Sequence, residues 1–227
     1  MPDERRHRGA HPEDAALFGA DWLDPLRRAV ADLSWLLSRG YAPVSALKVV
    51  GDRFNLSARQ RTAVMRCACP DQGLAGRRSR ETGLDSIAGR ELLIDGYNVL
   101  TTVEAALAGG VLIVGRDGCW RDMASMHGTW RRVEETPPAL ARIGQVIQGR
   151  HGSAEVVWYL DAPVSNSGRL KGVIQGVARE HDWPWRVELV LDPDKQLAGA
   201  KDALVATADS VILDRCGRWV QLAREVV

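Results

Sequence analysis

The sequence lacks the marks of a disulfide-stapled, zinc-finger or membrane-spanning protein. Its four cysteines make no disulfide framework, and Cys67 and Cys69 have no second Cys or His pair at zinc-finger spacing. No apolar run reaches the ~18 residues that a membrane span requires. The N-terminus is charged and lacks the apolar region of a signal peptide. We therefore expect a cytoplasmic protein with reduced cysteines and no membrane partner.

An excess of one charge is also missing. The 30 Lys and Arg residues nearly balance the 29 Asp and Glu residues, so the overall charge argues neither for nor against nucleic acid. Residues 1–90 carry 15 basic and 11 acidic side chains, whereas residues 91–227 carry 15 and 18. This distribution suits a part that grips phosphates beside a part that binds a cation, and an ordinary solvated surface explains it equally well.

The chain divides by composition into four segments. Apolar residues recur at helical spacing over 14–38, after Pro43 and from Ala58 to Cys67, with Ser57 as an N-cap. These helices form either a small bundle or a helix-turn-helix reader of nucleic acid. The predicted segments are a flexible leader (1–13), a small all-helical domain (14–72), a basic linker (73–89) and an α/β domain (90–227).

From residue 90 onward, strand and helix patterns alternate. Such alternation predicts right-handed βαβ units around a mostly parallel sheet. The expected strands are 91–94, 111–114, 155–160, 187–191 and 204–208, and the expected helices are about 99–108, 138–148, 168–181 and 195–203. A last apolar run at 218–222 fits an edge strand or a closing helix.

Aspartates follow three of these strands, namely Asp95, Asp161 and Asp209. The carboxyl ends of parallel strands meet at one edge, where ligands of open α/β sheets bind. Carboxylates gathered there repel one another unless a divalent cation lies between them, and hard oxygen ligands suit Mg²⁺ or Mn²⁺. Such a site can activate a water and stabilise charge on a phosphodiester. We therefore favour metal ligands over three separate helix caps.

Other acidic residues leave alternatives open. Asp214 fits either a metal ligand or a turn residue. Asp192 and Asp194 flank Pro193, which favours a turn or a supporting role around the metal.

Candidate contacts to phosphate lie in two basic segments. One opens a helix after Asp161 and is either a phosphate cradle or a serine-capped helix with solvated cations. The other is the linker, whose arginines could guide an RNA strand. The candidates are Ser165, Ser167, Arg169 and Lys171 in the first segment and Arg77, Arg78 and Arg80 in the second.

The motif Asp95-Gly96-Tyr97-Asn98 resembles the first motif of the PIN-like ribonucleases, particularly their NYN branch. Asp161, Asp209 and Asp214 resemble the later acidic positions of that superfamily. The resemblance covers roughly residues 90–215. It implies a PIN/Rossmann-like three-layer sheet and a Mg²⁺- or Mn²⁺-dependent endoribonuclease that cleaves RNA with a metal-activated water. Asp95, Asp161 and Asp209 would then be catalytic metal ligands, and Asn98 would orient the water or a phosphate oxygen.

The chain, with its small helical front, also resembles an uncharacterised prokaryotic family known as a domain of unknown function. PIN-like enzymes usually carry one more acid in mid-chain. The candidates here are Asp122, which we rank first as a further metal ligand, then Asp117, and Glu104.

None of these mid-chain acids lies in an unmistakable motif. This motivates an alternative, a non-catalytic RNA- or protein-binding module on a nuclease-like fold. A third hypothesis, a metal-dependent phosphohydrolase, lacks the Asp-x-Asp motif after the first strand. The oligomeric state stays open, a dimer included.

Overall fold

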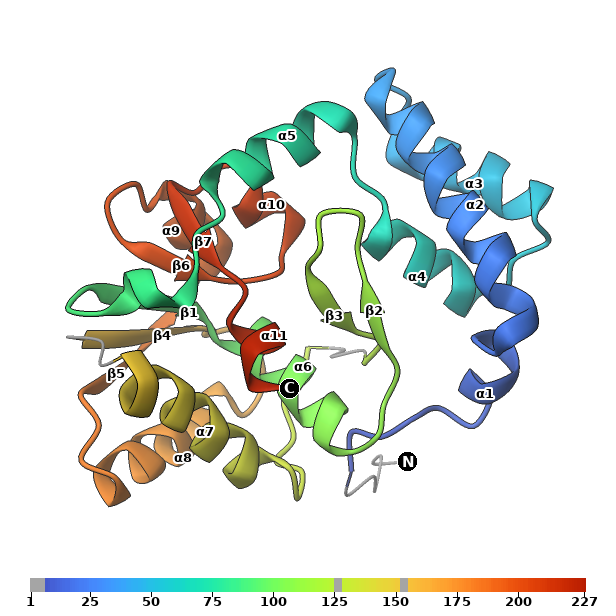
Figure 1. Cartoon of the computed structure of the whole chain (residues 1–227). Helices are drawn as coiled ribbons and strands as arrows, with labels where there is room; N and C mark the ends of the chain where they lie inside the picture. The colour runs from blue at the N-terminus through green and yellow to red at the C-terminus, as the bar shows by residue number, and fades with distance from the viewer. Residues whose placement is uncertain (1–6, 125–127, 152–154) are drawn as a thin grey trace.

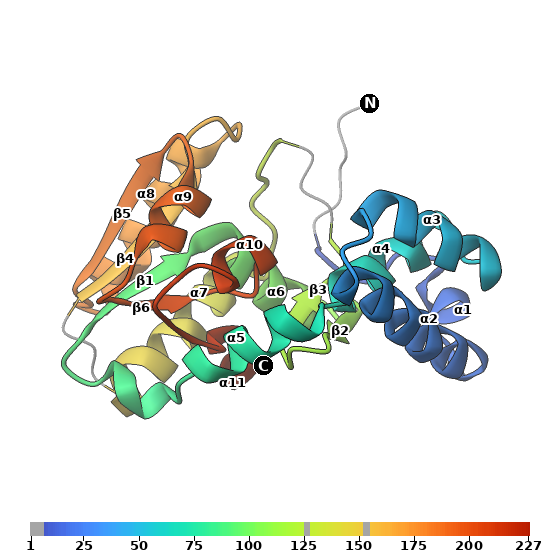
Figure 2. The same ribbon diagram turned by 90° about the horizontal axis from the view of Figure 1, so that it is seen from above.

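The computed structural model describes residues 7–124, 128–151 and 155–227. A helical N-terminal part is followed by an α/β part, and the two lie side by side in both views (Figures 1 and 2). In the described part of the chain, no helix is long and apolar enough to cross a membrane.

The N-terminal part packs its helices around a small apolar core. Its first three long helices were predicted nearly at their observed positions. Ser57 caps one of them by accepting a hydrogen bond from the backbone N–H of Gln60, whose side chain bonds back to Ser57 N. The helices are α1 (Asp14–Leu17), α2 (Ala20–Ser38), α3 (Pro43–Arg53), α4 (Ala58–Cys67) and α5 (Asp71–Arg80). Leu33, Val50 and Val64 lie at the centre of their core.

The segment predicted as a basic linker is mostly ordered structure. Most of α5 and the 3₁₀ turn η1 (Leu84–Ile87) fall inside residues 73–89. The composition suggested a connection because α5 contains few apolar residues. Its place is fixed by a buried arginine, Arg77, instead of an apolar stripe.

Residues 1–6 of the predicted leader lie outside the described residues. The rest of that leader contacts the α/β part, because the Arg8 guanidinium forms an ion pair with Glu104.

The centre of the α/β part is a sheet of five parallel strands. Their order is β5-β4-β1-β6-β7, so β1 is the middle strand. Within it, Ile94 lies opposite Trp158 on one side and Ala206 on the other. The strands are β1 (Glu91–Asp95), β4 (Glu155–Asp161), β5 (Trp185–Val190), β6 (Leu204–Ala206) and β7 (Arg218–Val220).

Helices cover both faces of this sheet (Figure 1). Leu92 and Ile94 of β1 belong to the core on one face, whereas Leu93 between them belongs to the core on the other. Both faces of the strands are therefore apolar, as expected for a buried parallel sheet. The first face packs α6 (Gly96–Leu107), α7 (Thr136–Gly144), the π-helical η2 (Gln145–His151), α8 (Ser167–Glu180) and α11 (Leu222–Val226). The second packs α9 (Pro193–Gly199) and α10 (Ser210–Leu213).

The α/β class, the parallel sheet and the helical N-terminal part are thus confirmed. The predicted strand at 111–114 is also present, but it does not belong to the parallel sheet. Residues 112–114 form β2 (Leu112–Val114), which pairs antiparallel with β3 (Trp120–Asp122) in a separate hairpin. The turn between them, with Gly118 at a positive φ of 82°, is too short to hold the crossover helix of a parallel pair. The last apolar run satisfies both alternatives, since β7 is an edge strand and α11 follows it.

Candidate functional site

Asp95 ends β1 at the carboxyl edge of the sheet and is 9% exposed. Its Oδ2 accepts a hydrogen bond from the Thr207 hydroxyl at 2.7 Å. Burial raises the pKa of the Asp95 carboxyl to about 7, and the neighbouring charges of Asp209 and Asp194 act in the same direction. A carboxylate in this position is costly without a positive partner.

Gly96 and Asn98 fix the backbone around Asp95. A Cβ at Gly96 would lie 2.8 Å from the carbonyl oxygen of Tyr159, so only glycine lets α6 begin this close to β4. The Oδ1 of Asn98 accepts a hydrogen bond from the backbone N–H of Ala208 at 2.8 Å. This bond ties the start of α6 to the end of β6, which leaves the Asn98 amide nitrogen as a donor at the carboxyl edge of the sheet.

Further carboxylates surround Asp95 along the same edge. Asp161 ends β4, and burial followed by the charge of Asp192 raises its carboxyl pKa. Asp209 follows β6 and caps α10, since its Oδ1 accepts from the backbone N–H groups of Val211 and Ile212. The structure therefore brings the three predicted aspartates to one sheet edge. Only one carboxylate oxygen of Asp209 caps α10, so capping of this helix is compatible with the metal-binding role predicted from the sequence.

Asp194, predicted from the sequence to be a turn residue or a supporting group, lies among these carboxylates. It lies in the first turn of α9, after the N-cap Asp192. Burial raises its carboxyl pKa, and so do the charges of Asp209, Asp161 and Asp192. Asp194 therefore interacts with all three aspartates predicted to end the strands at this edge, Asp95 included. Asp194 follows β5 as Asp161 follows β4, and this placement after a strand is the sequence signal for a site residue. The neighbouring Pro193 favoured a turn role instead.

Among the residues that the structure describes, no three His, Cys, Asp or Glu side chains are placed as the ligands of one ion. The carboxylates share an edge and repel one another without converging on a single point.

The three mid-chain acids lie in hydrogen-bonded sites of their own. Asp122, ranked first as a further metal ligand, accepts a hydrogen bond from the backbone N–H of Ala124 at 2.7 Å, and its other carboxylate oxygen lies 3.2 and 3.0 Å from the hydroxyls of Thr101 and Thr102. Glu104 is buried, and its Oε1 accepts from the Thr136 hydroxyl at 2.6 Å. The structure thus gives Asp122 and Glu104 packing and bonding roles on or beside α6.

Asp117 and Asp214 are held by Arg77. The guanidinium of Arg77 donates to Asp117 at 2.6 Å and to both carboxylate oxygens of Asp214 at 2.7 and 3.0 Å. Burial works against ionisation of Asp117, but hydrogen bonds and charge from Arg121 and Arg77 outweigh it and lower the carboxyl pKa. Asp214 is therefore a partner of Arg77, and its role as a metal ligand stays a prediction from the sequence.

The arginines of α5 differ in their exposure. Arg77 is 2% exposed, so it cannot contact RNA as predicted. Arg80 is partly buried and donates to the carbonyl oxygen of Leu213 at 2.7 Å. Arg78 is exposed and remains a candidate.

The predicted phosphate cradle after Asp161 is formed only in part. The backbone of Ser165 pairs with Gly128 and Trp130, and the Ser167 hydroxyl donates to the carbonyl oxygen of Ala162 at 3.2 Å. Both serines therefore stabilise the loop, and the N-cap of α8 is Asn166. Lys171 is partly buried and Arg169 is exposed. Arg169 lines a pocket that is described below.

Fold and site together define an α/β protein with aspartates gathered at the carboxyl edge of a parallel sheet, preceded by a helical part. Residues 84–225 match a family described as Domain of unknown function (DUF5616), and the chain belongs to this family. Residues 25–80 match a second family, Protein of unknown function (DUF434).

The chain is 29% identical over 188 residues to the "Uncharacterized protein MJ0935" of Methanocaldococcus jannaschii. The match covers 83% of this chain and 88% of the relative. No solved structure matches the chain.

Proposed function

We propose that the protein is a metal-dependent endoribonuclease of PIN-like type. The observation that supports it best is Asp95, a buried carboxylate in the middle of the sheet edge whose charged neighbours Asp194 and Asp209 are also acidic. A residue with only a packing role at such a buried position would be expected to be apolar. A structural carboxylate there would be expected to have an arginine partner.

The carboxylate oxygens at this edge are the type of ligand that a hard dication prefers. Asp95, Asp161 and Asp209 would hold Mg²⁺ or Mn²⁺, with Asp194 as a fourth carboxylate. The ion would lower the pKa of a water molecule and neutralise charge on the scissile phosphate. Within the chain, Thr207 orients Asp95 through its hydroxyl. Asn98 offers its amide nitrogen to a phosphate oxygen or to the attacking water.

The test is cleavage of a labelled single-stranded RNA with Mg²⁺ or Mn²⁺ by the wild type and by Asp95→Asn. We expect kcat/KM to fall by about a hundredfold or more, because a ligand and its charge are lost. Asp182→Asn is the matched control, since Asp182 is exposed, precedes β5 at the other edge of the sheet and has a positive φ that asparagine tolerates. Equal cleavage by wild type and Asp95→Asn would refute the proposal.

A second candidate is a non-catalytic RNA-binding module on the same fold. It is favoured by the absence of a formed three-ligand cluster among the described residues. It predicts RNA binding that persists in EDTA, weakens in Arg78→Ala and is never followed by cleavage.

A further inference from the structure

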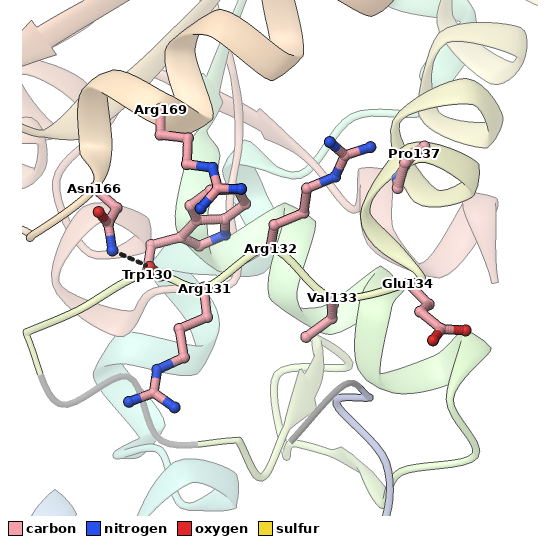
Figure 3. A pocket seen from close by; sticks show the side chains of 8 residues that line it. All are labelled: Trp130, Arg131, Arg132, Val133, Glu134, Pro137, Asn166 and Arg169. Atoms are coloured by element: carbon pink, nitrogen blue, oxygen red, sulfur yellow. Dashed lines mark hydrogen bonds between the residues drawn. The ribbon is translucent and has the colours of Figure 1, made fainter. Parts of the chain in front are cut away.

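A basic pocket lies where α8 begins, next to the loop that follows Asp161. Its volume is about 470 Å³, within the range of small-ligand sites. It is lined by residues 130–134, Pro137, Asn166 and Arg169 (Figure 3).

Two guanidinium groups are available in this pocket. Figure 3 shows those of Arg132 and Arg169 on the same side of the 130–134 segment, whereas Arg131 extends to the other side. Both side chains are exposed, and neither forms an ion pair or hydrogen bond with the described residues. The acid in the lining, Glu134, lies 3.8 Å from the ring of His7 and away from Arg169. The pocket therefore has an excess of unpaired positive charge.

The walls of the pocket are fixed by hydrogen bonds. The Asn166 side-chain amide donates to the carbonyl oxygen of Trp130 at 3.0 Å, the bond drawn in Figure 3. The backbone N–H of Trp130 donates to the carbonyl oxygen of Ser165. These bonds join a loop before α7 to the start of α8, so Arg132 and Arg169 come from different segments that are held together.

The N-terminus of α8 adds to the preference for an anion. The N-cap Asn166 has a φ of 67° and makes no side-chain capping bond to α8, because its amide is used for Trp130. The first turn of this 14-residue helix thus keeps its positive end toward the pocket. Guanidinium forks and a helix N-terminus together match a phosphate.

We propose that this pocket binds phosphate groups of the RNA strand that reaches the aspartates. The inference rests on the proposed function. Asp161 and Asn166 are the two ends of one short loop, so a strand lying in the pocket would lead along that loop toward the carboxyl edge. Arg132 and Arg169 are positioning residues for the substrate and do not touch the reacting atoms.

The experiment measures binding of a fluorescent single-stranded RNA with a 5′-hydroxyl end, in EDTA, over a range of salt concentrations. The double variant Arg132→Ala and Arg169→Ala is compared with Arg142→Ala and Arg179→Ala. The control pair removes the same charge from exposed positions on α7 and on the far end of α8. Circular dichroism checks that both variants are folded.

We expect the pocket variant to bind about tenfold more weakly. Its salt slope should fall by about 0.7 to 1.4, for one or two phosphates lost. The control pair should stay within about twofold of the wild type. Equal affinity of the pocket variant and the control pair overturns the inference.

This outcome is independent of the nuclease test. Loss of binding in the pocket variant without any metal-dependent cleavage would support the pocket and refute the nuclease. Cleavage that depends on Asp95, with unchanged binding by the pocket variant, would refute the pocket alone. If cleavage occurs, the pocket variant should raise KM and leave kcat unchanged.

Discussion

At the scale of single residues, Asp95 is the group whose surroundings are most unusual. Its donors, the Thr207 hydroxyl and the backbone of Asn98, are neutral, its charged neighbours are acidic, and within the described residues it forms no ion pair with a cationic side chain. Two more deeply buried carboxylates, Asp117 and Glu104, each have an arginine. The presence of an arginine partner marks Asp117 and Glu104 as structural carboxylates, whereas Asp95, without one, is available to a cation.

The raised pKa of Asp95 predicts a dependence of stability on pH in EDTA. The carboxyl pKa is about 7 in the folded chain and 3.8 as the ordinary value. Between about pH 4 and 7 the folded state therefore binds the extra proton, and the free energy of unfolding falls as the pH rises. Asp95→Asn has no such proton, so it should match the wild type near pH 4. It should be more stable near pH 8, by at most about 4 kcal/mol.

Urea denaturation of both proteins at several pH values measures this difference. Asp182→Asn serves as the control for the replacement of an aspartate by asparagine away from the site. A difference between Asp95→Asn and wild type that is constant from pH 4 to 8 would mean that Asp95 is ionised normally.

At the scale of elements, α5 and the hairpin β2–β3 are joined to the sheet by one buried guanidinium. Arg77 on α5 bonds Asp117 in the hairpin turn and Asp214 after α10. The indole N–H of Trp219 in β7 also donates to the carbonyl oxygen of Arg77 at 2.9 Å. These contacts connect four elements that are distant in the sequence.

Replacing Arg77 by Met should lower the free energy of unfolding by about 3 kcal/mol or more, because Asp117 stays buried and keeps Arg121 as its cationic partner but loses Arg77. Arg78→Met removes the same charge from an exposed site on the same helix and should change stability by less than about 0.5 kcal/mol. Urea midpoints of the two variants test this. A similar small effect of both substitutions would contradict the role of Arg77.

Two glycines in helices are expected to respond oppositely to alanine. A Cβ at Gly144 in α7 would overlap the ring of Trp183, whereas nothing lies within 4 Å of a Cβ at Gly176 in α8. Gly144→Ala should destabilise the protein by about 1–3 kcal/mol through overpacking. Gly176→Ala should stabilise it by about 0.5–1 kcal/mol because alanine favours the helix. Thermal midpoints decide the signs, and a stabilised Gly144→Ala would show that Trp183 does not pack there.

At the scale of the whole molecule, the two family segments form one structure. Family boundaries fall at residues 80 and 84, directly after α5. Contacts cross this boundary at several places. The Arg116 side chain donates to the carbonyl oxygen of Cys69 at 2.7 Å, and Arg59 donates to that of Met123 at 3.1 Å. The helical part is therefore bonded to the hairpin beside the sheet.

Much of this organisation followed from local sequence patterns. Periodicity located the helices and β1 and β4, Ser57 was recognised as a cap, and parallel strands implied that Asp95, Asp161 and Asp209 share an edge. Contacts between distant residues were not accessible in this way. Asp214 and Asp122 were assigned to a metal because their partners, Arg77 and the Thr101 and Thr102 hydroxyls, lie far away in the sequence. Arg132 was missed because it lies in an irregular segment without a motif.

The central claim is that the carboxylates at the sheet edge bind a divalent cation, and titration of the full chain with Mn²⁺ at pH 8 tests it most directly. At this pH the Asp95 carboxyl, with its pKa of about 7, is mostly ionised. We predict a saturable Mn²⁺ site in the wild type and in Asp182→Asn, and its loss in Asp95→Asn. Absence of binding to the wild type, or equal binding to Asp95→Asn, would contradict the account.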